Sequence, residues 1–441
     1  MVKRNFTIAG IIMLVVLISF VFLGCTRREA ASASPDGKRT VRIMVWGSTE
    51  GRYNYQRLFD QMFPDFVERI QIEWLLGGTG DDTVAERVRL ALAANESITD
   101  VVQLNYTQVP EFASLGALHS LDSIVAPVRN EMVTAFRLMT EFEGQTVAIA
   151  NSFKAKIWFY RKDIFDRAGI NVEEVRTLDD FINAGRRIQQ IDPKYMMWTL
   201  GPANPPYQYM MVLSGTDTVF ADRNGNWQLT TDPNFRRLLE AFRRLVESGV
   251  VANIPEWTPD WERAFADEIL ISYPNATWLA SDLFLHRYAP EQRGLWHATQ
   301  WPSFIGEEGG SEAGGDVFVI PIIAREVEAA KEVLHMLSLD PEGWFLGMAL
   351  GRAPVPVLQS WANDPRTREP HNFIGGDYAA EVLRSLNNFR LFGWDPAAAL
   401  TLSIINPYFD AAINGLMSID DALRTAQAAL ESQVGNPWQM W

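Results

Sequence analysis

Cysteine is nearly absent from this sequence, since its 441 residues include only one, Cys25. A single thiol cannot form a disulfide within the chain, so an ordinary hydrophobic core must hold the fold together. Apolar residues make up 47% of the sequence, which is ample for such a core in a chain of this length. The length itself predicts about two or three domains.

Histidine and positive charge are also scarce. The five histidines stand at no helical metal-ligand spacing, so we expect no metal site, and the sequence indicates no cofactor. Lysine and arginine number 39 against 54 aspartates and glutamates, which gives a net charge of −15. Because no basic stripe offsets this charge, we expect no nucleic-acid partner, and a neutral or cationic ligand is favoured.

The common nucleotide-binding and hydrolase motifs are missing as well. The glycine-rich run 77–80 lacks both the dinucleotide pattern G-x-G-x-x-G and the Walker Lys-Ser/Thr, so it predicts a plain loop. The tract 309–313 is one residue short of G-x-S-x-G. A glycosidase needs two carboxylates across a cleft, and the sequence places no such pair among Asp260, Glu262, Asp267 and Glu268. We therefore expect a protein that is not an enzyme, with a glycoside hydrolase as the alternative.

One long apolar run is present, at the N-terminus. Lys3 and Arg4 precede the apolar segment 6–23, a layout typical of a secretory signal peptide. The ending Phe-Leu-Gly-Cys at 22–25 resembles a bacterial lipobox, in which the cysteine takes a diacylglyceryl group and becomes the new N-terminus. We predict a signal peptide over 1–24, a lipid anchor on Cys25 with a flexible tether over 25–38, and a location outside the cytoplasmic membrane. An uncleaved anchor helix is the alternative.

Apolar periodicity then predicts an α/β fold. Val41, Ile43 and Val45 alternate with polar or flexible side chains and predict a strand that ends at Trp46. A helix over 53–63, a strand over 70–75, a helix from Thr83 and a strand over 100–104 follow. This order of elements is typical of an open, parallel α/β sheet. Further along, capping patterns predict helices that begin after positions 177, 232 and 418. A further helix is predicted at about 407–414.

Several segments carry a family resemblance. ALAANESITDVVQL, FASLGALHSLDS, KIWFYRKDIFDRAGIN and VRTLDDFINAGRRI stand in the same order as similar motifs of the family 1 extracellular solute-binding proteins. These are the sugar-type receptors of ABC importers, related to maltose-binding protein. Arg161 stands where the family usually has Asn, and Leu178 where it usually has Trp. The resemblance extends over nearly all of the chain after the tether.

This resemblance implies a two-lobed α/β fold of the type II periplasmic-binding-protein class, each lobe a mixed, mostly parallel sheet flanked by helices, with a hinge and a central cleft. We expect the first lobe at 39–150 plus 316–360 and the second at 151–315 plus 361–441. The implied function is that of a monomeric receptor that closes on a mono- or oligosaccharide and delivers it to the permease of an ABC importer. A receptor of the same fold for another solute, such as a polyamine, is a further alternative, beside the lipid-anchored glycoside hydrolase.

The candidate ligand-binding residues share a place in loops that we expect to face the other lobe. Open α/β sheets bind ligands outside the carboxyl ends of their strands, and flat aromatic faces suit pyranose rings. The candidates are Trp46, Glu50, Asn105, Tyr106, Lys154, Trp278, Gly315, Asp316, Arg352 and Trp394. For Trp278 the resemblance implies stacking on a sugar, and a place in the hydrophobic core is the alternative.

Overall fold

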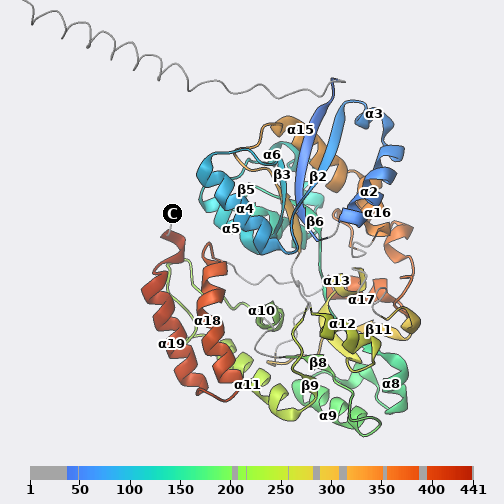
Figure 1. Ribbon diagram of the computed structural model, residues 1–441, viewed down its shortest axis with the longest axis vertical. Coiled ribbons are helices and arrows are strands. Elements are labelled where there is room, and N and C mark those ends of the chain that lie inside the picture. The colour runs from blue at the N-terminus through green and yellow to red at the C-terminus, as the bar shows by residue number, and fades with distance from the viewer. Residues whose placement is uncertain are drawn as a thin grey trace, which may run out of the picture.

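The computed structural model describes residues 37–47, 49–200, 207–214, 216–256, 258–281, 289–306, 315–350, 355–386 and 395–439. The predicted signal peptide and Cys25 lie outside these ranges. Figure 1 shows the described chain as an upper and a lower part, each built around strands and covered by helices. None of the described helices combines the length and the apolar character that crossing a membrane requires.

The upper part contains a five-stranded sheet in the order β2-β1-β3-β12-β6. Its strands are β1 (Arg39–Trp46), β2 (Ile70–Gly78), β3 (Val101–Asn105), β6 (Ile149–Ser152) and β12 (Asp316–Val319). β1 pairs in parallel with β2 and β3, as the sequence predicts. β12 is antiparallel to both β3 and β6, so the sheet is mixed rather than wholly parallel. The reason is that β12 enters the sheet at the edge where β3 ends, with Asp316 opposite Asn105.

The glycine run 77–80 is only partly the loop that the sequence predicts, because β2 continues through Gly78. Tight packing explains the first glycine of the run. A side-chain carbon on Gly77 would come within 2.7 Å of Val84 Cγ2 and 2.8 Å of Met44 Cγ. Gly77 therefore lets the helix after β2 lie close to the sheet.

Helices lie on both sides of this sheet (Figure 1). α4 packs against β1, β2 and β3, whereas α15 contacts β1 and β6, and α2 contacts β2. The helices of the upper part are α2 (Thr49–Met62), α3 (Pro64–Val67), α4 (Asp81–Ala94), α5 (Val109–Ser114), α6 (Asp122–Val125), α7 (Thr134–Thr140), α15 (Val327–Ser338) and α16 (Pro341–Ala349).

The lower part contains a three-stranded sheet in the order β10-β7-β11. These strands are β7 (Lys156–Arg161), β10 (Ser272–Ala276) and β11 (Trp296–Thr299), and both pairings are antiparallel. β8 (Trp198–Thr199) and β9 (Val251–Ala252) form a parallel pair, whereas the antiparallel pair of β4 (Glu141–Phe142) and β5 (Gln145–Thr146) belongs to the upper part (Figure 1). Within the described residues, parallel pairing in the lower part is thus limited to β8–β9 and short bridges.

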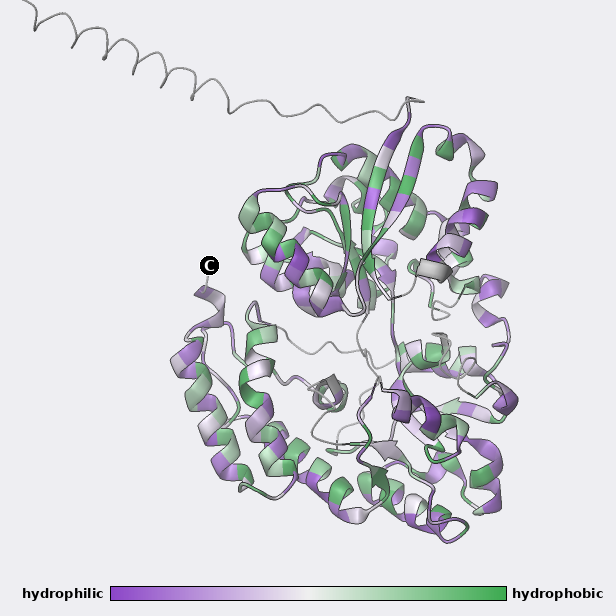
Figure 2. Ribbon diagram, in the orientation of Figure 1, coloured by the Kyte–Doolittle hydropathy of each residue, from purple (hydrophilic) through white to green (hydrophobic). Residues whose placement is uncertain are grey.

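The helices of the lower part show the predicted caps. Thr177 and Asp180 form a capping box at the start of α9, Asp232 caps α11, and Ser418 caps α19. Figure 2 shows α11, α18 and α19 banded with hydrophobic and hydrophilic residues, as expected for helices with one buried face. The helices are α8 (Lys162–Arg167), α9 (Leu178–Gln189), α10 (Tyr207–Leu213), α11 (Pro233–Ser248), α12 (Pro259–Ala266), α13 (Trp278–Ser281), α17 (Tyr378–Ser385), α18 (Ala398–Ile413) and α19 (Ile419–Gln433).

α18 starts earlier than the sequence predicts. The sequence predicts a helix that begins at about Pro407. The helix in fact begins at Ala398 and contains Pro407 in its interior. Ile404, Ile405 and Phe409 are buried on either side of the proline, and α18 packs on α11 and α19. This burial outweighs the hydrogen bond that proline cannot donate.

Candidate functional site

The upper sheet brings polar side chains together at the edge where β1 and β3 end. β12 begins at this edge, and its pairing places Asp316 opposite both Asn105 at the end of β3 and Ser152 at the end of β6. The backbone N–H of Tyr106 donates to the carbonyl of Gly315 at 3.1 Å. A Cβ on Gly315 would displace the end of the Met139 side chain and would lie 3.1 Å from the carbonyl oxygen of Ser152. Three predicted site residues, Asn105, Gly315 and Asp316, therefore meet at one place.

Asp316 is the centre of the hydrogen bonding at this edge. Lys154 Nζ donates to its Oδ1 at 3.1 Å, and Ser152 Oγ donates to its Oδ2 at 3.0 Å. Lys154 lies between β6 and β7, in the short segment that connects the upper sheet to the lower one. The ion pair thus joins this connection to the first residue of β12 in the upper sheet.

Two further carboxylates were not predicted as site residues, and the first of them, Asp81, feels the charges of Lys154 and Asp316. Asp81 and Asp82 begin α4, directly after the glycine run that follows β2. Burial raises the pKa of Asp81 to about 6, with further upward contributions from the charges of Asp82 and Asp316 and an opposing one from Lys154. Gln108 Nε2 donates to Asp82 Oδ1 at 3.3 Å. The sequence could have indicated them through its strand–loop–helix order, because this order puts the first residues of a helix at the carboxyl end of a parallel strand.

The lower sheet presents Lys156 and the residues after β10 toward the same segment. Lys156 is the first residue of β7 and pairs with Ala276, the last residue of β10. Its Nζ lies 4.6 Å from the centre of the Trp301 ring, and burial lowers its pKa to about 7. Lys156 was not predicted as a site residue, because in the sequence it is only the first residue of a strand. The contact of its ammonium group with the Trp301 ring depends on the antiparallel register of β11 with β7.

The other predicted site residues have different positions. Trp46 is partly buried and packs against the core at the end of β1, and Tyr106 is buried. Trp278 begins α13 directly after the turn that follows β10 and is 6% exposed. Glu50 lies in α2, but its side chain is outside the described part, as are Arg352 and Trp394.

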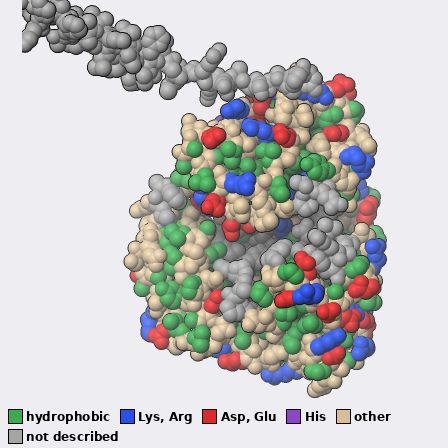
Figure 3. Space-filling view, in the orientation of Figure 1, with side chains coloured by type: hydrophobic (Ala, Val, Ile, Leu, Met, Phe, Trp, Pro, Cys, Tyr) green, Lys and Arg blue, Asp and Glu red, His purple; other side chains and the backbone are tan. Residues whose placement is uncertain are grey.

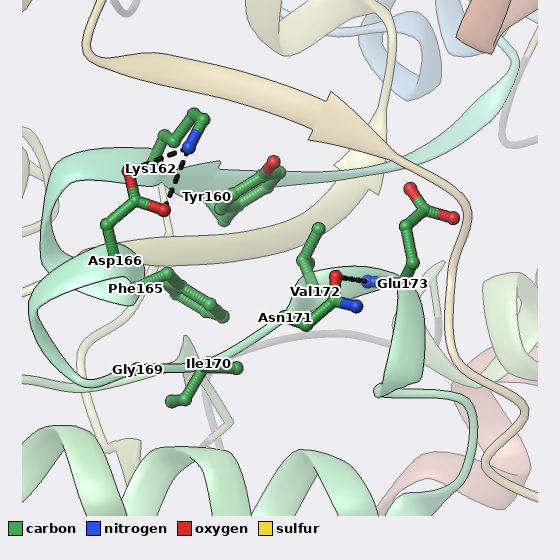
Figure 4. Close-up of a pocket in the computed structure, with 9 residues that line it drawn as sticks. All are labelled: Tyr160, Lys162, Phe165, Asp166, Gly169, Ile170, Asn171, Val172 and Glu173. Atoms are coloured by element: carbon green, nitrogen blue, oxygen red, sulfur yellow. Dashed lines mark hydrogen bonds and ion pairs between the residues drawn. The ribbon is translucent and has the colours of Figure 1, made fainter.

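The molecule is hollowed between its upper and lower parts on the face shown in Figure 3, where acidic side chains occur at the upper rim. A separate pocket of about 520 Å³ lies at the far end of β7. Tyr160, Phe165 and Ile170 are among its lining residues, with the ion pair Lys162–Asp166 at 2.7 Å (Figure 4). None of the predicted site residues lines this pocket. In the described ranges, no group of His, Cys, Asp and Glu side chains is arranged to hold a metal ion.

Comparison with known proteins identifies the family. The model of the bacterial extracellular solute-binding proteins matches residues 47–342. The chain belongs to this family. The family is extracellular, so the protein acts outside the cytoplasm, and the resemblance found in the sequence motifs is confirmed.

Relatives of this solute-binding protein include two arabinooligosaccharide-binding proteins. The protein of Halalkalibacterium halodurans is 25% identical over 374 residues, which cover 80% of each chain. That of Bacillus subtilis is 20% identical over 346 residues, 75% of this chain and 76% of its own.

Solved structures confirm the two-lobed type II fold. A binding protein of B. animalis subsp. lactis in complex with beta-1,6-galactobiose has a TM-score of 0.75 at 17% identity and covers 90% of this chain and 97% of its own. Maltose-bound MalE3 of T. maritima has a TM-score of 0.75 at 19% identity, with 90% of this chain and 100% of its own covered. The upper and lower parts correspond to the two lobes of this fold.

Proposed function

We propose that the protein is the substrate-binding protein of an ABC importer, which captures a carbohydrate between its lobes and delivers it to the permease. The observation that carries this proposal is the opposition of two polar sheet edges across a short connection. Asn105 and Asp316 lie on one edge and Lys156 on the other, and only residues 153–155 separate β6 from β7. Family membership and the sugar ligands named for several relatives support the same conclusion.

Ligand capture requires that the lobes move relative to each other. We assign residues 39–150 plus 316–360 to the first lobe and 151–315 plus 361–441 to the second. The connecting segments carry Lys154 and Gly315, and closure of the hinge around a sugar is the change that the permease senses. The proposed contacts to the sugar come from Trp46, Glu50, Asn105, Tyr106, Lys154, Trp278, Gly315, Asp316, Arg352 and Trp394.

A thermal-unfolding screen tests this function. Arabino-, galacto- and malto-oligosaccharides are added to the purified protein, with spermidine as a cationic non-sugar. A ligand at 100 times its Kd stabilises the folded protein by about 2.7 kcal/mol, so a true ligand raises Tm clearly. Stabilisation by spermidine and by no sugar contradicts the carbohydrate assignment.

An assay for hydrolysis of the same oligosaccharides separates a receptor from a hydrolase. We propose that the protein is not an enzyme and acts as a monomer. A receptor binds one equivalent of sugar and releases it unchanged. New reducing ends formed from oligosaccharides at catalytic amounts of protein would instead identify a glycoside hydrolase.

We propose further that Cys25 carries the lipid anchor. Because the chain has no second cysteine, no disulfide depends on this thiol, and Cys25→Ser should yield a folded protein that is released from the membrane. Membrane fractionation and mass spectrometry of the mature N-terminus measure this. A Ser variant that remains membrane-bound, or a native protein without a diacylglyceryl group on Cys25, contradicts the anchor.

A further inference from the structure

Lys156 is a buried ammonium group with no acidic partner in the described part of the chain. Lys156 is 7% exposed, and no Asp or Glu of the described residues forms an ion pair with its Nζ. A buried charge without a partner is unfavourable, and it becomes favourable only when an opposite charge or hydrogen-bond acceptors surround it. The fold therefore holds a cation ready for an acceptor that the described chain does not supply.

Two tryptophans form the surroundings of this ammonium. The Trp301 ring is fixed by its Nε1, which donates to the carbonyl of Ile157 at 2.8 Å, and Lys156 Nζ lies over its face. Trp198 packs edge-on against Trp301, with ring centres 5.5 Å apart at 83°. The Nε1 of Trp198 is buried and has no acceptor among the described residues. We call Lys156, Trp198 and Trp301 the Lys156 cluster; it holds the Lys156 ammonium over the face of Trp301, while Trp198 is fully buried and supports that ring.

The Lys156 cluster lies where a bound sugar is expected. Lys156 follows Lys154 by two residues, so it stands at the end of β7 nearest to the upper sheet. The upper edge has the opposite character, because Asp81, Asp82 and Asp316 supply carboxylate oxygens. A ligand between the edges therefore meets acceptors on the first lobe and donors on the second.

We propose that the Lys156 cluster binds the carboxylate of an acidic saccharide, one that contains a uronate residue. The inference rests on the proposed carbohydrate-binding function and narrows its ligand class. The ligand carboxylate accepts a charge-assisted hydrogen bond from Lys156 Nζ, and a sugar face stacks against an indole. Hydroxyl groups at the other end of the saccharide donate to the acidic upper edge. A neutral sugar leaves the buried ammonium without its counter-charge.

The overall charge of −15 does not prevent this recognition. At physiological ionic strength the Debye length is about 8 Å, so exposed charges farther away are largely screened. The contacts inside the site then decide the affinity. The net charge slows the approach of an anion more than it weakens the bound complex.

Calorimetric titration of the full chain with matched saccharides tests the proposal. Digalacturonate is compared with galactobiose, and cellobiouronate with cellobiose, because each acid differs from its partner by carboxylates in place of hydroxymethyl groups. We expect an acidic member to bind at least about tenfold more tightly than its neutral partner. Lys156→Met should weaken binding of the acid about 10- to 100-fold and change the Kd of the neutral sugar little. Lys156→Arg keeps the charge and should retain part of the preference.

The control is Lys194→Met, which removes an exposed lysine that also lies near an aromatic ring, 5.7 Å from the centre of Tyr195. It should leave both affinities unchanged. If neutral sugars bind as tightly as acids, or Lys156→Met weakens both equally, the acidic-saccharide inference is wrong while the carbohydrate function stands. If no saccharide of either kind binds, the carbohydrate function and the inference are both wrong.

Discussion

Lys154, on the connection between β6 and β7, is paired with Asp316, the first residue of β12. They are 162 positions apart in the sequence, and Lys154 Nζ donates to Asp316 Oδ1 at 3.1 Å. Asp316 is buried, and Ser152 Oγ supplies its second hydrogen bond. The ion pair holds the connection between β6 and β7 to the upper sheet, because Lys154 lies on that connection and Asp316 begins β12.

Removing Lys154 should destabilise the protein. Lys154→Met leaves a buried carboxylate without its cation, and we expect the free energy of unfolding to fall by about 1–3 kcal/mol. Urea melts measure the change. The control is Lys162→Met, which breaks the exposed pair with Asp166 and should cost less than about 1 kcal/mol. Equal losses in the two variants would show that Lys154–Asp316 behaves as an ordinary surface pair.

Asp81 should make stability fall as pH rises through the weakly acidic range. Its pKa rises from 3.8 to about 6 on folding, chiefly through burial. Between these values the folded state binds more protons than the unfolded state, so the contribution of Asp81 is complete below about pH 4 and is lost as pH passes 6.

The variant Asp81→Asn tests whether Asp81 makes the free energy of unfolding fall as pH rises. The variant should match the parent near pH 4 and exceed its free energy of unfolding by up to about 3 kcal/mol above pH 6, at about 1.4 kcal/mol per pKa unit. Urea melts at several pH values give the profile. Glu73→Gln, which changes an exposed carboxylate on β2, should leave the profile unaltered. A difference between Asp81→Asn and the parent that does not vary with pH contradicts the assignment.

Lys156 should have the opposite effect on stability, at higher pH, because the folded protein releases its proton more readily than the unfolded chain does. Burial lowers its pKa from 10.5 to about 7, so the unfolded state binds more protons between these values. The free energy of unfolding without ligand then increases with pH in this window, by at most about 1.4 kcal/mol per pH unit, and this stability is lost as pH falls to 7. Lys156→Met should be more stable than the parent at pH 7, with a gap that narrows toward pH 10. A constant gap would mean that the ammonium is solvated in the folded protein.

Burial changes what we expect of Trp278. Besides the sugar contact that we propose for it, Trp278 is 6% exposed and packs in the hydrophobic core. Trp278→Ala should therefore lower the free energy of unfolding by about 3–5 kcal/mol. Denaturant melts and sugar titration on the same variant measure both effects. A loss below about 1 kcal/mol together with a large loss of affinity would instead support the stacking role.

The amino-acid sequence by itself determined the elements and the family. Strand periodicity around Val41, the capping box at Thr177 and the cap at Asp232 are set by neighbouring residues, so they can be read without the fold. The family could likewise be recognised from the sequence, because its motifs occur in a fixed order along the chain. Pro407 is where this local reasoning failed, because packing on both sides of it decides the course of α18.

Only the tertiary structure decided which side chains meet. β12 inserts between β3 and β6, and this pairing brings Asp316 to Ser152 and Lys154 and places Asp81 close enough to feel its charge. The register of β11 on β7 likewise puts Trp301 over Lys156. Residues far away in the chain decide whether an ionisable group is buried and which groups it pairs with. Lys156 is unremarkable in the sequence and becomes a buried cation only after the sheets have formed.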